Sequence, residues 1–301
     1  MILITGQRTK LLRYQISASM RKEKENENIS YSYNNFSAAF KNASTTINEN
    51  EFLAIVGHTG SGKSTFIQNL NALLIPTSGS VMVDEVEIKD KIKIKNIKEL
   101  RKKIGIVFQF PEYQLFEETV EKDILFGPKN FDFKEEELVS LASETLKKVG
   151  LDDSYLSKSP FELSGGEKRR VAIAGILAFN PDVLIVDEPT AGLDPIASSK
   201  MMDLFKKLHD EGKTIILVTH QMDHVLKYCN RVIVFKDGEI KKDCTPMDLF
   251  KDENEVSRLN LDVPYIISLV NKLTLKYPKL KEYNIKSIED FVSAYKDVIS
   301  L

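Results

Sequence analysis

Residues 57–65 have the residue types and spacing that bind a chain of phosphates. They read GHTGSGKST and fit the pattern G-x-x-x-x-G-K-[ST], whose glycines let backbone N–H groups turn inward around phosphate oxygens. Lys63 would then reach the β- and γ-phosphates, and the Ser64 hydroxyl would bind Mg²⁺. The pattern needs a strand before it and a helix after it, which residues 52–56 and 63–74 supply. We therefore predict a nucleoside triphosphate site here.

A second apolar run, residues 183–186, ends in two adjacent carboxylates, Asp187 and Glu188. Asp187 would hold the Mg²⁺ shell. Glu188 would polarise an attacking water, because phosphoryl transfer mainly needs positioning and charge stabilisation. An apolar run followed by Asp-Glu can simply be a strand leaving the core. Together with the phosphate loop, however, the pair predicts hydrolysis of the bound nucleotide.

Gly57, Gln109, Asp187 and His220 each come at or just after the end of an apolar run. Ligands of open α/β sheets bind beyond the carboxyl ends of the strands, so we expect these residues at one edge. Gln109 can contact Mg²⁺ or water through its amide, and His220 can hydrogen-bond the γ-phosphate or the water. A lone Gln or His at a strand end is more often a surface residue, but the shared edge favours a site.

A second helix terminus that could receive an anion follows Leu163. Ser164 is a good N-cap, and Gly165 and Gly166 leave the backbone amides bare before Glu167. Since the loop at 57–65 already grips phosphates within the chain, we interpret this terminus as closing on nucleotide held by another subunit. A purely structural cap is the alternative.

The elements that must position these residues alternate along the chain. Continuous apolar runs predict strands covered on both faces, at residues 52–56, 104–108, 183–186 and 215–219. Helical patterns lie between them, at residues 63–74, 135–149, 166–179 and 197–209. Parallel strands joined by helices favour a layered α/β fold.

Bulk composition sets limits on the class of protein. Of 301 residues, 42% are hydrophobic and 29% charged, with a net charge of −2, so a basic nucleic-acid footprint is absent from the chain as a whole. Its 2 cysteines, Cys229 and Cys244, lie in no metal-binding pattern, which indicates a reducing compartment and no structural zinc. No apolar run reaches the length of a membrane span, and no signal peptide is evident. Any membrane part must come from a partner.

Three regions are expected from composition. Residues 1–28 are rich in mixed charges and predict a flexible extension, residues 29–244 look globular, and residues 245–301 look helical again. Within the middle region, the basic block 89–103 includes the alternating stretch 91–95. We expect a solvated strand face followed by a surface helix, with a nucleic-acid or lipid patch as the alternative.

These motifs, in this order, resemble the ATPase subunits of ABC transporters over roughly residues 29–244. The resemblance implies ATP and Mg²⁺ as cofactors. It also implies a P-loop fold with a mixed-sheet core, an antiparallel β-subdomain, a helical subdomain at about 110–180 and a C-terminal helical extension. Tyr33 matches the family's adenine-stacking aromatic, and Glu167 stands where the family often has Gln. The matching motifs are the phosphate loop at 57–65, Gln109, residues 163–167, residues 183–188, residues 191–194 and His220.

A narrower likeness lies in residues 108–120 and 126–131, which read FQFPEYQLFEETV and FGPKNF. They resemble the A-prime-type ATPase of energy-coupling factor (ECF) transporters. This resemblance implies a heterodimer with a sister ATPase, with a homodimer as the alternative, held partly by residues 245–301. The dimer would dock on a transmembrane coupling protein at the cytoplasmic face of the cell membrane. A separate membrane subunit would capture a vitamin or other micronutrient, such as cobalt or nickel. Residues 111–116, including Glu112, are our candidate for touching the membrane partner.

The predicted site residues fall into three roles. Catalysis is assigned to Glu188, His220 and Gln109, and metal binding to Ser64, Gln109 and Asp187. The predicted nucleotide-binding residues are Tyr33, Gly57, His58, Thr59, Gly60, Ser61, Gly62, Lys63, Ser64, Thr65, Ser164, Gly165, Gly166 and Glu167.

Other functions remain as alternatives. A soluble ABC-type ATPase of DNA repair would carry a coiled coil or zinc insert, and a translation factor would carry two motors; the sequence has neither feature. An ATPase of another ABC transporter class differs in the segment after Gln109. A regulatory protein without activity is disfavoured by the presence of Lys63, Asp187, Glu188 and His220. Nucleic acid is not an expected partner, and the cargo would be chosen by a different subunit.

Overall fold

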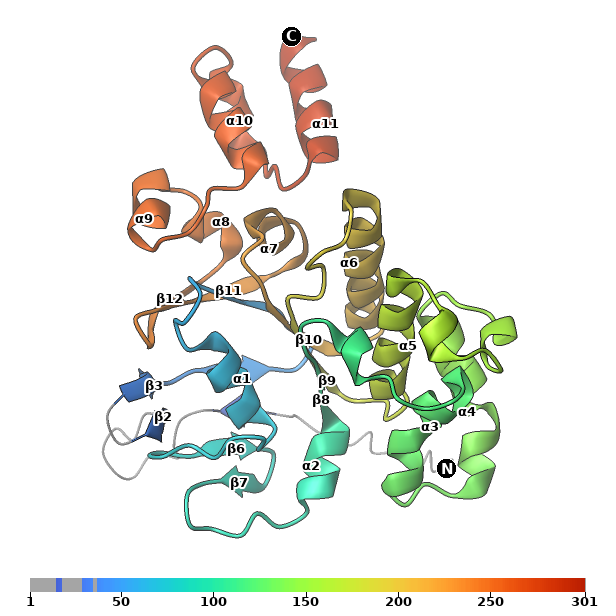
Figure 1. Ribbon diagram of the computed structural model, residues 1–301. Coiled ribbons are helices and arrows are strands. Elements are labelled where there is room, and N and C mark those ends of the chain that lie inside the picture. Colours follow the sequence, from blue (N-terminus) through green and yellow to red (C-terminus); the bar gives the residue numbers. More distant parts are fainter. Residues whose placement is uncertain (1–14, 18–28, 35–36, 301) are drawn as a thin grey trace, which may run out of the picture.

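The continuous apolar runs form the central sheet in a computed structural model, which describes residues 15–17, 29–34 and 37–300 (Figure 1). The strand order is β12-β11-β5-β10-β9-β8; these strands are parallel, except that β12 runs antiparallel to β11. All four predicted runs are confirmed as neighbouring strands. The bounds are β5 (Phe52–Val56), β8 (Ile104–Val107), β9 (Val183–Asp187), β10 (Thr214–Val218), β11 (Arg231–Lys236) and β12 (Glu239–Cys244).

Helices and a smaller sheet cover the two faces of this sheet. Alternate residues of β5 point to opposite sides, as a strand requires. Phe52, Ala54 and Val56 join the core formed with α5 (Gly165–Leu177), α6 (Pro195–Asp210) and α7 (Met222–Tyr228). Leu53 and Ile55 join the core formed with α1 (Lys63–Leu70) and the antiparallel strands. Burial on both faces explains why these strands are apolar throughout.

An antiparallel β-subdomain lies beside α1 (Figure 1). It contains a sheet of order β4-β1-β6-β7 and the pair β2-β3. Strand β1 falls within the predicted extension 1–28 and pairs with β4 and β6, so the prediction was wrong for these residues; the rest of the extension lies outside the described residues. The bounds are β1 (Gln15–Ser17), β2 (Ile29–Asn34), β3 (Ser37–Ala43), β4 (Thr46–Asn48), β6 (Val81–Val83) and β7 (Val86–Ile88).

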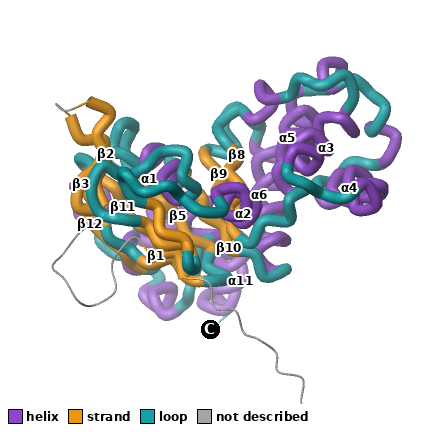
Figure 2. The backbone as a smooth tube through the Cα atoms, turned by 90° about the horizontal axis from the view of Figure 1, so that it is seen from below, coloured by secondary structure: helices purple, strands orange, loops and turns teal. Residues whose placement is uncertain are grey.

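A helical arm projects to one side of the sheets (Figure 2). It is built from α3 (Val120–Asn130), α4 (Glu135–Lys148) and α5, which pack on one another. Three short 3₁₀ helices accompany them: η1 (Pro111–Gln114), η2 (Asp153–Tyr155) and η3 (Pro160–Glu162). Helix η1 packs against α5. The arm therefore occupies the chain between β8 and β9, and its last helix, α5, leads into β9.

The C-terminal region is helical, as expected, and stands at the opposite end of the molecule from the β-subdomain (Figure 1). The bounds are α8 (Pro246–Leu249), α9 (Glu253–Arg258), α10 (Tyr265–Thr274), η4 (Pro278–Glu282) and α11 (Ile288–Ile299). In the described part of the chain, no helix combines the length and apolarity needed to span a bilayer.

The strand predicted at residues 91–95 is wrong. These residues form a loop between β7 and α2 (Ile97–Lys103), whereas the surface helix is confirmed as α2. Lys91 and Asn96 of this loop have left-handed backbones, at φ 61° and φ 57°, and that conformation cannot continue a strand. Residues 91–95 alternate in sequence like a strand, but no neighbouring strand pairs with them in the described structure.

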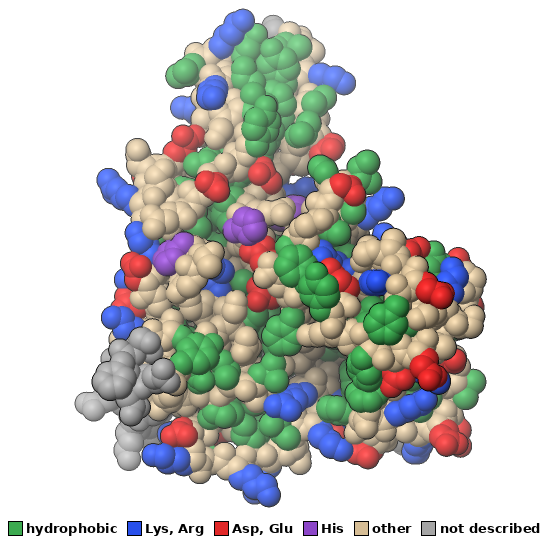
Figure 3. All heavy atoms as spheres, viewed as in Figure 1, with side chains coloured by type: hydrophobic (Ala, Val, Ile, Leu, Met, Phe, Trp, Pro, Cys, Tyr) green, Lys and Arg blue, Asp and Glu red, His purple; other side chains and the backbone are tan. Residues whose placement is uncertain are grey.

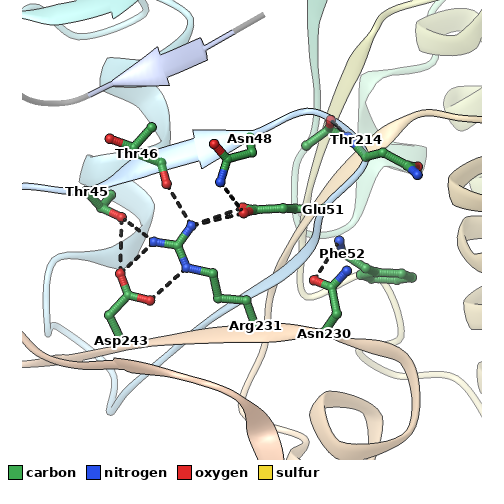
Figure 4. A network of polar contacts seen from close by, with 10 residues as sticks. Thr45, Thr46, Asn48, Glu51, Phe52, Thr214, Asn230, Arg231 and Asp243 are labelled. Carbon is green, nitrogen blue, oxygen red and sulfur yellow. Dashed lines mark hydrogen bonds and ion pairs between the residues drawn. The ribbon is translucent and has the colours of Figure 1, made fainter. Parts of the chain in front are cut away.

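Arg231 ties the β-subdomain to the central sheet at the start of β5 (Figure 4). Its guanidinium donates to both carboxylate oxygens of Asp243, at 2.7 and 2.6 Å, and to those of Glu51, at 3.2 and 3.1 Å. It also donates to the Thr46 carbonyl oxygen at 2.7 Å and to the Thr45 hydroxyl at 3.0 Å. The planar fork of Arg suits this many acceptors at once.

We predict that Arg231→Gln lowers the free energy of unfolding by about 2 kcal/mol, because several charge-assisted hydrogen bonds are lost together. Urea unfolding of the purified protein measures this. The matched control is Lys206→Gln, which removes an exposed pair with Asp210 one helical turn away; such pairs contribute about 0.5 kcal/mol or less. Equal losses in the two variants would show that the Arg231 contacts add nothing beyond a surface pair.

Candidate functional site

The phosphate-binding loop connects β5 to α1 and depends on two glycines. Gly57 has φ 148°, and a Cβ built there would lie 2.1 Å from the Phe235 carbonyl oxygen. Gly62, at φ 101°, caps α1, and a Cβ there would lie 2.6 Å from the Ala39 carbonyl oxygen. No side chain fits at either position, so the sequence pattern reflects close backbone packing as well as access for phosphates.

Lys63 lies across the mouth of this loop. Its ammonium donates to the carbonyl oxygens of Gly57 at 2.6 Å and His58 at 2.9 Å. Burial lowers the pKa of Lys63, an effect opposed by the negative charges of Glu188 and Asp187. The Ser61 hydroxyl accepts a third hydrogen bond, at 3.5 Å. A desolvated ammonium held by neutral oxygens attracts an anion strongly, because few water molecules need to be displaced.

A single cavity of about 540 Å³ brings most of the predicted residues together. It is lined by Tyr33, Ala39, Thr59, Gly60, Gly62, Lys63, Ser64, Thr65, Gln109, Asp187, Glu188 and His220. The loop supplies one wall, and the residues that follow β8, β9 and β10 supply the opposite one. This is the shared edge expected from the strand ends; Ala39 is the one lining residue that we had not predicted.

Several predicted nucleotide-binding residues do not line the cavity. Gly57 packs against the Phe235 backbone, and the Ser61 side chain is fully buried. The His58 ring turns away, with Nε2 3.6 Å from an Asp237 carboxylate oxygen and Nδ1 2.8 Å from the Thr59 carbonyl oxygen. Residues 164–167 are also outside the cavity, at the start of α5.

Tyr33 stands at the entrance of the cavity with most of its ring exposed. Its hydroxyl shares a hydrogen bond of 2.9 Å with the Thr65 hydroxyl, and the Tyr31 ring packs edge-on against it at 5.0 Å between centroids. These contacts hold one face of the ring where a flat ligand group can stack. The stacking role itself stays a prediction.

Asp187 and Ser64 face each other across the cavity floor. The Ser64 hydroxyl donates to Asp187 Oδ2 at 3.2 Å. Burial raises the pKa of Asp187, and the nearby charge of Glu188 adds to this, against the Ser64 hydrogen bond and Lys63. A carboxylate and a hydroxyl this close, with the Gln109 amide in the same cavity, form the oxygen donor set that Mg²⁺ prefers. Among the described residues, no group of three or more His, Cys, Asp or Glu could hold a metal ion.

Glu188 is held in a strained and well-determined position. Its φ is 48°, in a region that costs non-glycine residues of order 1–3 kcal/mol. The carboxylate is mostly buried and is fixed by His220 Nδ1 at 2.8 Å and by the Thr219 hydroxyl, which donates at 3.3 Å. His220 itself is largely exposed. The pair can therefore accept a proton and pass it toward solvent.

The helix start at Ser164 forms a capping box. Glu167 N–H donates to the Ser164 hydroxyl oxygen at 3.4 Å, and Ser164 N–H donates to Glu167 Oε2 at 2.8 Å. Hydrogen bonds from the hydroxyls of Ser164 and Tyr155 lower the pKa of Glu167 to about 2. A Cβ at Gly165 or Gly166 would meet no atom within 4 Å, so this terminus faces open space.

Glu112 occupies a different place from the one predicted. We expected it to touch a membrane partner, but its carboxylate is only 15% exposed and accepts from Arg169 Nε at 3.0 Å and Nη2 at 2.7 Å. Burial raises the pKa of Glu112, but the hydrogen bond and charge of Arg169 outweigh this and lower it overall. The outward side chains of this segment are Tyr113 and Phe116, which are 84% and 56% exposed.

Sequence reasoning missed Arg169. A signal was present, because Arg169, Ile173 and Leu177 recur at helical spacing and all three are buried on one face of α5. A charged residue on such a face must have partners within the fold.

We predict that Asp187→Asn raises the thermal unfolding midpoint of the nucleotide-free protein at neutral pH. The folded pKa of Asp187 is raised, so at neutral pH folding disfavours the ionised carboxylate, and the neutral isostere removes that cost. The gain should shrink as pH falls through the folded pKa and vanish below the ordinary aspartate pKa, where the carboxyl is protonated in both the folded and the unfolded state. Differential scanning calorimetry at neutral and acid pH measures both effects. A lower midpoint for the variant at neutral pH would contradict the argument.

Comparison with known proteins gives consistent results. A family model described as "ABC transporter" matches residues 40–191. The chain is 49% identical over 269 residues to the energy-coupling factor transporter ATP-binding protein EcfA2 of Streptococcus pneumoniae serotype 2, covering 88% of this chain and 96% of that protein. It is 53% identical over 232 residues to the protein of the same name from Enterococcus faecalis, covering 77% and 80%.

Solved structures show the same likeness. The chain matches cbiO1 of Clostridium perfringens, part of the ABC transporter complex cbiONQ, with a TM-score of 0.69 and 37% identity over 89% of this chain and 96% of that one. It also matches a dimeric ATP-binding cassette in a post-hydrolysis state with ADP and Pi. That match has a TM-score of 0.64 and 32% identity over 77% of this chain and 98% of that one.

Proposed function

The chain belongs to the energy-coupling factor transporter ATP-binding proteins, a family of ABC transporter ATPases, and we infer that it powers an importer of this class by hydrolysing ATP. The observation that carries this inference is the cavity in which Lys63, Ser64, Gln109, Asp187, Glu188 and His220 meet. The relatives agree with the resemblance read from the sequence and favour none of the alternatives, whether a DNA-repair or translation ATPase or another transporter class.

The cavity residues divide the work of phosphoryl transfer. Lys63 leaves the loop carbonyls to contact the β- and γ-phosphates, while the loop N–H groups and the N-terminus of α1 surround them. Ser64, Asp187 and Gln109 would hold Mg²⁺, which neutralises phosphate charge when bound. Tyr33 stacks on the adenine at the entrance.

Glu188 and His220 act on the attacking water. The Glu188 carboxylate accepts a hydrogen bond from the water and orients it toward the γ-phosphorus, and His220 holds that carboxylate in place through its 2.8 Å contact. The strained backbone at Glu188 keeps the carboxylate aimed into the cavity before the substrate arrives. Such preorganisation is the main means of catalysis when the protein forms no covalent bond.

The site is one half of a pair. Ser164, Gly165, Gly166 and Glu167 present a bare helix terminus outside the chain's own cavity. In a sandwich dimer this terminus would close on ATP held by a sister ATPase, whose corresponding terminus would complete the present cavity. The similarity to a dimeric cassette supports this arrangement. A heterodimer is our first choice and a homodimer the alternative.

Residues 245–301 offer a surface for holding the two ATPases together. Apolar side chains gather over α10 and α11 at the top of the molecule (Figure 3). Tyr265, Leu275, Ile288, Val292 and Ile299 are exposed there. Apolar side chains that recur along both helices and remain outside the core suit burial against a partner.

The membrane partner is expected on the side of the helical arm that carries exposed aromatic rings. Tyr113 packs against Phe110 and Phe116 against Phe126, at 6.0 and 4.7 Å between ring centroids. A transmembrane coupling protein would insert an apolar helix here and hold the ATPases at the cytoplasmic face of the membrane. A separate membrane subunit would choose the cargo, a vitamin or a transition metal ion.

We predict that Glu188→Gln in the assembled ATPase retains ATP binding and loses turnover by about a hundredfold or more, because the amide cannot accept the proton. Equilibrium binding of ATP and steady-state phosphate release measure the two effects. Glu211→Gln, an exposed change at the end of α6, is the matched control and should leave both unchanged. Turnover that survives in Glu188→Gln would remove this residue from the role of base.

We predict that Tyr113→Ala combined with Phe116→Ala reduces recovery of membrane subunits with the tagged ATPase, because the exposed rings supply the apolar contact. ATP binding should be unchanged, since neither ring lines the cavity. Ile92→Ala, which removes an exposed apolar residue from the loop between β7 and α2, is the control. Full recovery of membrane subunits with the double variant would move the docking surface elsewhere.

A further inference from the structure

Arg169 donates hydrogen bonds beyond its ion pair with Glu112, and its acceptors belong to two different segments of the site. Its side chain is 4% exposed. Nε and Nη2 donate to the two Glu112 oxygens at 3.0 and 2.7 Å. Nη1 donates to the carbonyl oxygens of Pro189 at 3.2 Å and Ala191 at 2.8 Å. All three nitrogens of the guanidinium are therefore used.

The first of these segments follows Gln109. Phe110 has a left-handed backbone, with φ 55° and ψ 57°, and starts the helix η1 that contains Glu112. The Arg169 guanidinium lies 5.6 Å from the centre of the Phe110 ring. Arg169 thus contacts Phe110 through the ring and Glu112 through the carboxylate. It grips the chain immediately after Gln109.

The second segment follows Glu188. Here too the backbone is left-handed, with φ 48° at Glu188, and the turn closes through Ala191 N–H, which donates to the Glu188 carbonyl oxygen at 3.1 Å. Arg169 binds the carbonyl oxygens on both sides of Thr190 in this turn. The turn also approaches Phe110, since a Cβ built at Gly192 would lie 3.7 Å from its ring.

Strained backbone persists only where surrounding contacts determine it. The two strained residues of this site are Phe110, which directly follows Gln109, and Glu188. Arg169 binds the chain beyond each of them and connects the two segments through one rigid, planar group. Lysine could not replace it, because a single ammonium cannot reach two carboxylate oxygens and two carbonyls in one plane.

We propose that Arg169 is a positioning residue for hydrolysis: it fixes the segments after Gln109 and Glu188 relative to each other, and so sets where these two side chains meet the attacking water. This rests on the proposed function as an ATPase. It assigns no contact between Arg169 and the nucleotide, because Arg169 is outside the cavity lining.

The test compares Arg169→Lys with Arg170→Lys in the assembled ATPase. Arg170 is the next residue of α5, and among the described residues it donates a hydrogen bond only to the Gly150 carbonyl oxygen, at 3.4 Å, so it controls for the same change on the same helix. We expect Arg169→Lys to lower kcat by about tenfold or more, since small misplacements of catalytic groups have large effects. The Kd for ATP should change less than about twofold, because the phosphate loop is untouched. Arg170→Lys should keep wild-type values of both.

A purely structural role predicts a different result. Arg169→Lys would then lower the unfolding midpoint while the folded fraction keeps a wild-type kcat, and that outcome overturns the proposal. An equal loss of ATP affinity and kcat overturns it as well, because it would indicate general damage to the site. Absence of turnover in the unmodified assembly, by contrast, would reject the proposed function before Arg169 is considered.

Glu112→Gln keeps the test decisive if Arg169→Lys does not fold. This isosteric change removes the charge from η1 and leaves the Arg169 contacts to Pro189 and Ala191 in place. We expect a smaller fall in kcat, again with ATP affinity retained. A wild-type kcat in Glu112→Gln would show that η1 does not need to be fixed, and would overturn the proposal.

Discussion

The parallel pairing of β5, β10, β9 and β8 is the constraint on which the rest of the molecule depends. Backbone hydrogen bonds place Val218 beside both Ile55 and Asp187, and Val107 beside Val186. These four strands therefore end at the same level. The phosphate loop, Gln109, Glu188 and His220 each follow within two residues of those ends, so they converge on one edge without any loop having to reach across the molecule.

Convergence at this edge places strained and buried charged groups close together. Glu188 and Phe110 have left-handed backbones, Asp187 is buried with a raised pKa, and Lys63 is buried with a lowered one. Each of these features is unfavourable in the free protein. The buried charges of Lys63 and Asp187 suit an anionic ligand with a divalent cation. The rest of the fold offsets them through two buried cores and through networks such as that of Arg231. Stability and function are thus divided between different parts of the chain.

The sequence predicted the central strands well, because a strand buried on both faces must be apolar throughout. It also predicted most of the residues that line the cavity, since a phosphate loop constrains glycine and lysine spacing strongly; Ala39 was missed, and several predicted residues lie outside the lining. It failed at residues 91–95, where alternation had no neighbouring strand to pair with. It did not predict the burial of Glu112, which depends on Arg169, a residue 57 positions away. Contacts of that kind arise from tertiary packing, and no local pattern reports them.

We propose that this cavity hydrolyses ATP only when a second ATPase completes it. The most direct measurement is ATP turnover per chain across a dilution series of the assembled ATPase, with ATP binding and the oligomeric state followed on the same samples. We expect turnover per chain to fall as the dimer dissociates, while ATP binding persists through the phosphate loop. Turnover per chain that stays constant under conditions where light scattering shows only monomers would contradict it.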